Sequence, residues 1–363
     1  MSTIRVACIG DVMCGDQFMK LGRGAGSNID KYGPDFLPPE IVTLFRAHDA
    51  VLCNTECILS DVGRKEYSLR SLQMRGRPRT AKYLAQWGIT AAHLANNHIL
   101  EHGVDAARDT ARNLEEAGIR VVGAGPNGSF DAGVTATRMR VNKMTLSMVG
   151  ACFHPGRYAF RPATLEQVLE TVRTEVGEGQ IVVVSLHWGD ELIDRPSLWQ
   201  QRAARNLIRA GARLVAGHHA HVFQGVYEEK GSLVAYSLGN FIFDDEFDLT
   251  RWTAILSVSI GEQGVSEWTL IPVRIGQDYR PTLTSGKAQA ALQREIARRC
   301  DLVAEMPAES KPYEEAYCRE LKSLDRGGRR EMWKAFIKDW RCHRPLFWPQ
   351  AVLRPVRRRL GIW

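Results

Sequence analysis

The chain has 363 residues, of which 44% are apolar and 25% charged, an ordinary globular composition that allows one large α/β domain or two smaller ones. Because it lacks an apolar run of about eighteen residues, no transmembrane helix is expected, and Met1–Gly10 shows a strand pattern in place of a secretory signal. The eight cysteines are scattered without a Cys-x-x-Cys pair, which excludes a disulfide framework and favours the reducing cytoplasm.

Strand and helix patterns alternate over the first part of the chain. Strands are predicted over Ile4–Gly10, Ala50–Cys53, Ile89–Ala95, Ile119–Val122, Thr145–Ala151, Ile181–Leu186 and Arg213–Ala216. Helices are predicted over Leu37–Arg46, Arg79–Trp87, Val104–Ala117, Leu165–Val176 and Leu198–Ala210. This alternation predicts an α/β protein with layered sheets.

The second half adds antiparallel strands and then helices. The strands are expected over Val222–Phe243, Thr253–Ile260 and Glu267–Ile275, and the helices over Lys287–Arg299, Pro312–Leu324 and Arg330–Trp340. Gly123–Gly128 matches Gly-x-Gly-x-x-Gly, but no amphipathic helix follows, so a turn is predicted there and not a dinucleotide site.

The charge is unevenly distributed along the chain. From Lys287 onward there are 18 Lys and Arg and 10 Asp and Glu, which gives this part a net charge of +8. The whole chain has a net charge of +7, so the residues before Lys287 sum to about −1. We therefore divide the chain into a domain at 1–285 and a basic, aromatic-rich helical extension at 286–363.

Polar side chains follow five of the predicted strands at the point where each strand ends. They are Asp11, Glu56, the pair Asn97-His98, His187 and the pentad Gly217–His221. Because ligand sites in α/β sheets lie beyond the carboxyl ends of the strands, we expect these side chains to converge. Taken singly, each has a structural explanation as a turn residue, a solvated charge or a hydrogen-bonded core histidine.

The pentad and its companions favour a metal site. His219 and His221 are two residues apart, so in extended chain both would point to the same side, whereas His218 is assigned a structural role. Nitrogen and oxygen donors suit Mn²⁺, Fe or Zn²⁺, and the number of donors favours two divalent ions bridged by a carboxylate. Ligation by Cys14 or Cys53 is the less favoured alternative.

These motifs closely resemble the CapA family of poly-γ-glutamate capsule biosynthesis proteins, which have a calcineurin-like metallophosphoesterase fold. The matching blocks cover about residues 4–245 in the family's order. They are Gly10-Asp11-Val12-Met13, Asn54-Thr55-Glu56, Asn96-Asn97-His98, His187-Trp188-Gly189-Asp190-Glu191, Gly217–His221 and Tyr236-Ser237-Leu238-Gly239-Asn240-Phe241. The resemblance implies a four-layer αββα sandwich with a dinuclear metal site, to which the helices predicted after Lys287 add a C-terminal helical extension.

The resemblance also assigns roles to individual residues. It implies that Asp11 and His221 hold one metal ion, that Asn97, His187 and His219 hold the other, and that Glu56 bridges the two. Asp11 and His98 are the expected catalytic residues, with His98 as general acid or as electrostatic partner of the transition state.

Four positions depart from the related patterns. Met13 stands where the wider superfamily has the His of Asp-x-His, Glu56 replaces an Asp, Ala220 replaces a Pro and Leu192 replaces a Tyr. The first of these leaves one metal position with fewer ligands.

Four further residues are assigned to substrate binding. Arg75 and Arg161 are expected in loops, where either could clamp an anion through paired hydrogen bonds, with a plain surface role as the alternative. Glu191 and Asn240 belong to the matching blocks.

The predicted function is that of a metal-dependent, phosphoesterase-like hydrolase. It would act on an anionic substrate in the biosynthesis of capsule, poly-γ-glutamate or a related cell-surface polymer, with capsule-synthesis proteins as partners. The alternative is a non-catalytic, metal-binding assembly subunit that binds an anionic polymer.

The extension has three interpretations, because basic and aromatic side chains interleave along it. It could be a helical wrap packed on the domain, or an attachment to an anionic membrane surface at its cytoplasmic face. Nucleic acid, the third interpretation, is not expected as a partner despite the clustered arginines.

Overall fold

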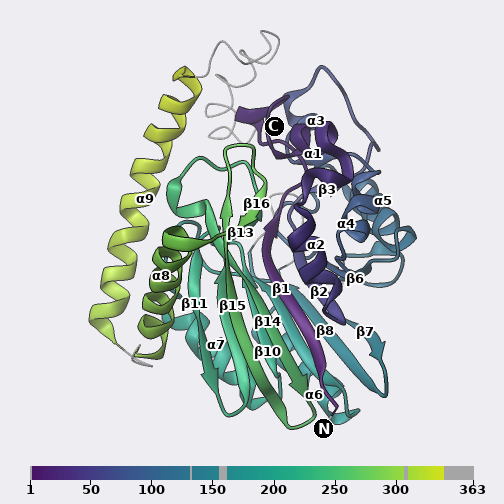
Figure 1. Cartoon of the computed structure of the whole chain (residues 1–363), viewed down its shortest axis with the longest axis vertical. Coiled ribbons are helices and arrows are strands. Elements are labelled where there is room, and N and C mark those ends of the chain that lie inside the picture. The colour runs from purple at the N-terminus through teal and green to yellow at the C-terminus, as the bar shows by residue number, and fades with distance from the viewer. Residues whose placement is uncertain (1, 131–132, 155–161, 306–309, 339–363) are drawn as a thin grey trace.

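The computed structural model describes residues 2–130, 133–154, 162–305 and 310–338. Two β-sheets pack face to face and carry helices on their outer faces (Figure 1). The first sheet runs in the order β16 (Pro281–Leu283), β15 (Gly264–Ile275), β14 (Trp252–Gly261), β1 (Ile4–Val12), β2 (Ala50–Thr55), β5 (Ala91–His93) and β6 (Arg120–Val122), with β13 (Asn240–Ile242) also pairing with β1.

The second sheet lies behind the first. Its order is β11 (Phe223–Glu229), β12 (Ser232–Leu238), β10 (Leu214–His218), β9 (Ile181–His187), β8 (Met144–Cys152) and β7 (Val134–Val141). A small parallel pair joins β3 (Ile58–Leu59) to β4 (Arg75–Gly76). In the second sheet β8, β9, β10 and β12 pair in parallel, and antiparallel strands close both edges.

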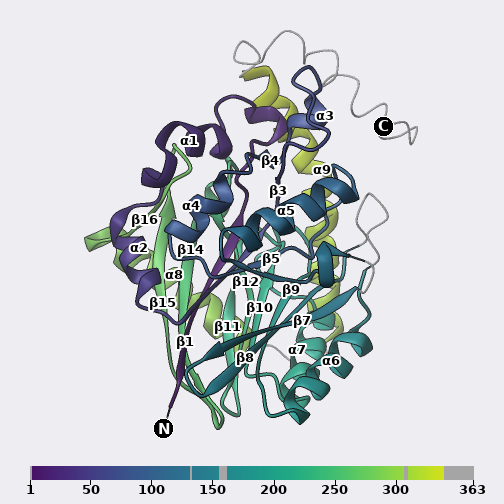
Figure 2. The same ribbon diagram turned by 90° about the vertical axis from the view of Figure 1, so that its right-hand side faces the viewer.

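The helices divide between the two outer faces and one flank (Figure 2). They are α1 (Ala25–Tyr32), α2 (Pro39–Arg46), α3 (Leu69–Leu72), α4 (Thr80–Gln86), α5 (Val104–Glu116), α6 (Leu165–Gly177), α7 (Leu198–Arg209), α8 (Gly286–Ala304) and α9 (Lys311–Lys338). Single 3₁₀ turns lie at Phe18–Lys20, Gly33–Phe36, Pro126–Gly128 and Asp248–Thr250.

Side-chain alternation along the strands produces the layers. On β1, Ala7 and Ile9 pack against α1, α2, α4 and α5, whereas Val6 and Cys8 face the second sheet. On β9, Val183 faces the first sheet and Val184 packs under α6 and α7. Because both faces of these strands are buried, their sequences are continuous apolar runs. The predicted four-layer αββα sandwich is confirmed.

The sequence analysis located most elements and missed some. α1, α3, β3, β4 and β16 were not predicted. Pro312–Leu324 and Arg330–Trp340 were predicted as separate helices, which is wrong for the described residues because α9 continues through Gly327 and Gly328. Two glycines cost a helix about 2 kcal/mol relative to alanine, which does not end a helix of this length. The turn at Gly123–Gly128 is confirmed.

The C-terminal helices pack on the sandwich along one flank (Figure 1). α8 covers the edge strand β11 and places Ile296 in the core between the sheets. The Tyr313 hydroxyl donates to the Pro196 carbonyl, and the Tyr317 hydroxyl donates to Asp190 at 2.7 Å. Among the described residues, no helix has the length and apolarity needed to cross a membrane.

Candidate metal centre

The predicted site residues meet at the carboxyl ends of the central strands. Asp11 is in register with Asn54 of the parallel neighbour β2, and His218 with His187 across β10 and β9. Gly10 lets β1 approach the next segment closely, since a Cβ there would lie 2.0 Å from the Gly239 carbonyl oxygen. This approach brings Asp11 alongside Asn240.

One group of donors consists of Asp11, Glu56 and His221, whose ligand atoms lie within 4.8 Å of one another. His221 Nδ1 lies 3.4 Å from Asp11 Oδ2, and His221 Nε2 lies 3.7 Å from Glu56 Oε1. Asp11 Oδ1 accepts a hydrogen bond of 2.8 Å from the Asn54 amide. Asp11 and Glu56 are fully buried, so their carboxylates face this cluster and not bulk water.

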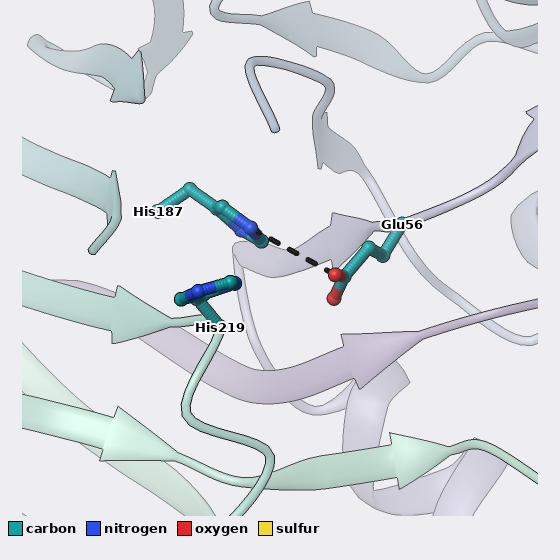
Figure 3. A group of neighbouring side chains, drawn as sticks. All are labelled: Glu56, His187 and His219. Carbon is teal, nitrogen blue, oxygen red and sulfur yellow. Dashed lines mark ion pairs between the residues drawn. The ribbon is translucent and has the colours of Figure 1, made fainter. Parts of the chain in front are cut away.

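A second group shares Glu56 and adds His187 and His219 (Figure 3). His187 Nε2 lies 3.7 Å from Glu56 Oε1 and 3.0 Å from Asn97 Oδ1. The rings of His187 and His219 have centroids 4.5 Å apart. The two groups therefore meet at one carboxylate, as the resemblance implies for a bridging ligand.

The donor set fits divalent ions. Glu56 Oε1 is buried and has no hydrogen-bond partner, although His98 Nε2 lies 3.8 Å away and the Nε2 atoms of His187 and His221 lie 3.7 Å away. Ligand atoms that share one ion at about 2.1 Å lie roughly 3–3.5 Å apart, close to these separations. An unpartnered buried carboxylate oxygen is costly unless a cation compensates it.

Burial and charge give the two groups different protonation. Burial lowers the pKa of His187 and of His219 well below the usual range, so both imidazoles are neutral, as metal ligands must be. Burial also lowers the pKa of His221, but the Glu56 and Asp11 carboxylates outweigh it and hold that pKa well above the usual range. Burial raises the pKa of Glu56.

His219 and His221 converge because the backbone turns, and not because it is extended. β10 ends at His218, and the next residues turn, with φ of 89° at His219 and 59° at His221. The expectation that both point to one side because the chain is extended is therefore wrong. Left-handed backbone at a non-glycine residue costs about 1–3 kcal/mol and is concentrated at functional sites.

His98 lies at the edge of the cluster, and a hydrogen bond on the side away from the cluster fixes its ring. Its Nδ1 donates to Glu101 Oε2 at 2.9 Å, and Glu101 in turn accepts a hydrogen bond from the Gln73 side chain. Because Nδ1 is occupied, Nε2 is the nitrogen that faces Glu56. The ring is partly exposed, so it can contact both the cluster and solvent.

The structure adds residues that the sequence analysis missed. The His154 ring lies against the His219 ring, with centroids 3.9 Å apart and the planes tilted by 40°, and His154 Nε2 contacts the Gly189 carbonyl. Asn54 contacts both Asp11 and His187. His154 lies two residues after the end of β8, so its position after a strand could have identified it, whereas Glu101 has no such signal.

The four residues assigned to substrate binding have different surroundings. Glu191 is exposed, and its carboxylate lies within 4.8 Å of the ligand atoms of His219 and His221. Asn240 is buried, and its Oδ1 lies 2.8 Å from His221 Nδ1. Arg75 lies in β4 and is buried in a pocket wall, so both the expected loop position and the plain surface role are wrong for it. Arg161 lies outside the described residues.

The buried thiols near the cluster are protonated. A hydrogen bond with Cys57, together with burial, raises the pKa of Cys14 well above the usual range, and burial raises the pKa of Cys53 to about 12. Met13 is fully buried in the hydrophobic core under the outer helices. Asp11, Glu56 and His221 thus remain the buried donors of the first group.

Comparisons of the sequence with known proteins agree on the family. The chain is 26% identical over 307 residues to the capsule biosynthesis protein CapA of Bacillus anthracis, covering 81% of this chain and 73% of the relative. It is 27% identical over 298 residues to the PGA biosynthesis protein CapA of Bacillus subtilis, covering 80% and 76%. The fold is similar to that of a phosphatase from Mycoplasma pneumoniae, with a TM-score of 0.46, 12% identity and coverage of 76% and 94%. The model of the bacterial capsule synthesis protein family PGA_cap matches residues 5–245, and the chain therefore belongs to this family.

Proposed function

We propose that the protein is a metal-dependent hydrolase that acts on an anionic substrate in the synthesis of capsule or a related polymer. The observation that carries this proposal is the buried Glu56 carboxylate, which is shared by the groups Asp11, Glu56, His221 and Glu56, His187, His219. The relatives named above are capsule and PGA biosynthesis proteins, which supports a polymer or its precursor as the substrate.

The proposed roles follow from the contacts. Asp11 and His221 would hold one divalent ion (Mn, Fe or Zn), Asn97, His187 and His219 the other, and Glu56 both. Such a pair of ions supplies an activated water and stabilises the negative charge that develops on the substrate.

Proton transfer is assigned to His98 alone. The hydrogen bond from its Nδ1 to Glu101 fixes the ring and leaves Nε2 toward the cluster, where it can donate a proton to the leaving oxygen or nitrogen.

Substitution of His219 by alanine tests the proposal. We expect the variant to bind fewer metal ions per chain and to lose at least about 100-fold in turnover, because a ligand of the second group is removed. Metal content is measured on the purified protein, and turnover on a panel of phosphoesters and γ-glutamyl amides. His48→Ala is the matched control, since His48 contacts Leu44 and Ser257 and none of the candidate ligands.

Two results would contradict the proposal. Full turnover in metal-depleted His219→Ala protein would show that the cluster is not the reaction centre. Loaded wild-type protein that hydrolyses nothing in the panel would instead support the non-catalytic, polymer-binding subunit.

A further inference from the structure

A pocket of about 180 Å³ is lined by the segments that follow β1 and β3. Three guanidinium groups line it, from Arg64, Arg75 and Arg77. Two of the three are paired at the rim: Arg64 Nε lies 2.7 Å from Glu66, and Arg77 Nη1 lies 3.3 Å from Asp61. The rim charges therefore largely compensate one another.

Arg75 differs from the rim arginines because it is only 5% exposed and has no carboxylate partner among the described residues. Its Nη1 donates to the carbonyls of Ser60 and Val62 at 2.6 and 2.9 Å. Its Nε is buried without a hydrogen-bond partner. Burial lowers the pKa of Arg75 to about 10, and Asp61 and Asp109 only partly offset this from a distance.

An uncompensated buried cation is expensive, so a ligand that removes the cost is expected. A guanidinium has five donors, and the two carbonyls occupy only Nη1. The edge formed by Nε and Nη2 remains, and this edge matches a carboxylate through two parallel hydrogen bonds.

The pocket is close enough to the metal centre to serve the same ligand. Cys14 lines it and follows Asp11 by three residues, which limits their Cα separation to about 11 Å. Arg75 pairs with Ile58, two residues beyond Glu56. The segment after β1 also approaches Arg75 closely at Gly15, where a Cβ would lie 2.3 Å from the Arg75 backbone nitrogen.

We propose that this pocket is a subsite for a carboxylate of the substrate chain, with Arg75 as its anchor. The proposal rests on the proposed function, since it places one acidic group in the pocket while another part of the same molecule reaches the metal centre. Asp16, Asp30 and Glu66 also line the pocket, and these carboxylates repel a phosphate dianion more strongly than a carboxylate monoanion.

Binding of a short glutamate oligomer to the metal-loaded, full-length protein tests the subsite by titration calorimetry. We expect Arg75→Gln to weaken binding at least about tenfold, and Arg75→Lys to recover only part of it because lysine lacks the fork. Arg120→Gln is the control, since it removes the same charge from the exposed end of β6 and should leave affinity unchanged. Metal content should be the same in all variants.

A second variant covers the case in which Arg75 is also needed for folding. Leu21→Trp fills the pocket from its partly buried wall and leaves Arg75 in place, and we expect a similar loss of oligomer affinity. Unchanged affinity in folded Arg75→Gln and Leu21→Trp proteins would overturn the subsite. Tighter Arg75-dependent binding of inorganic phosphate than of the oligomer would overturn the carboxylate assignment.

The outcomes separate the subsite from the proposed function. Arg75-dependent binding by a loaded protein that hydrolyses nothing would contradict the hydrolase and support the subsite. Hydrolysis with binding that does not depend on Arg75 would contradict the subsite alone.

Discussion

Asn240 determines which nitrogen of His221 faces the metal centre. Its side-chain oxygen accepts from Nδ1 at 2.8 Å, so Nε2 is the nitrogen left facing Glu56. Partners of this kind fix the tautomer and the orientation of a ligating imidazole. The buried position of Asn240 favours this positioning role over the substrate contact expected from the motif alone.

Replacement of Asn240 by leucine should weaken metal binding. Loss of such a partner costs about 10–100-fold in metal affinity, because the imidazole is no longer held in one orientation. Competition with a chelator measures the affinity, and Asn206→Leu on α7 serves as the control. Equal affinity of Asn240→Leu and wild-type protein would contradict the positioning role.

At the scale of elements, the first turn of α7 supports the loop that leads from β9 to α7. Its first turn is closed by a capping box in which Ser197 accepts from the Gln200 backbone and Gln200 accepts from the Ser197 backbone. The Gln200 side chain lies against Gly189, where a Cβ would come within 2.7 Å. The start of α7 and the segment that carries Glu191 are therefore packed together.

Removal of the cap by Ser197→Ala should lower the free energy of unfolding by about 1 kcal/mol, since an orphan backbone N–H loses its acceptor. Chemical denaturation measures this, and metal content should stay unchanged because no ligand is touched. Ser266→Ala on β15 is the control, with an expected effect within about 0.5 kcal/mol. A loss as small as that of the control would show that the cap contributes nothing.

At the scale of the whole molecule, the described part of the extension is a structural wrap. α8 closes the edge of the second sheet, and α9 contacts the loop after β9 through Tyr317 and Asp190. The boundary at 285/286 stays a prediction, as does the assignment to the cytoplasm. The basic and aromatic residues at 339–363 lie outside the described residues, and the predicted contact with an anionic membrane depends on them.

Deletion of Pro349–Trp363 tests that membrane contact. The segment contains Arg354, Arg357, Arg358 and Arg359, and each cation near an anionic surface contributes about 1 kcal/mol, so binding to phosphatidylserine vesicles should fall at least about tenfold. Neutral vesicles are the control, and hydrolysis and metal content should not change. If the deletion variant binds vesicles as well as the full chain does, the predicted contact with an anionic membrane is wrong.

The sequence by itself determined most of the elements and the sheet edge at which the candidate site residues gather. Apolar runs such as Ile181–Leu186 predict buried strands because both faces of such strands exclude water, and polar residues directly after them predict a site at one sheet edge. The Gly-rich start of α1 and the two-residue strands β3 and β4 carry no periodic signal, so they were not predictable.

Only the tertiary structure decided how the donors meet. His219 and His221 converge through left-handed backbone held by packing, and Gly10 brings Asp11 to Asn240 because β1 and the Gly239 turn touch. Neither feature follows from local propensity. The left-handed backbone at His219 and His221 opposes the intrinsic preference of these residues, and the contacts of Asp11 join segments more than 200 residues apart. The uncompensated charge of Arg75 is likewise a property of its burial, which depends on the whole fold.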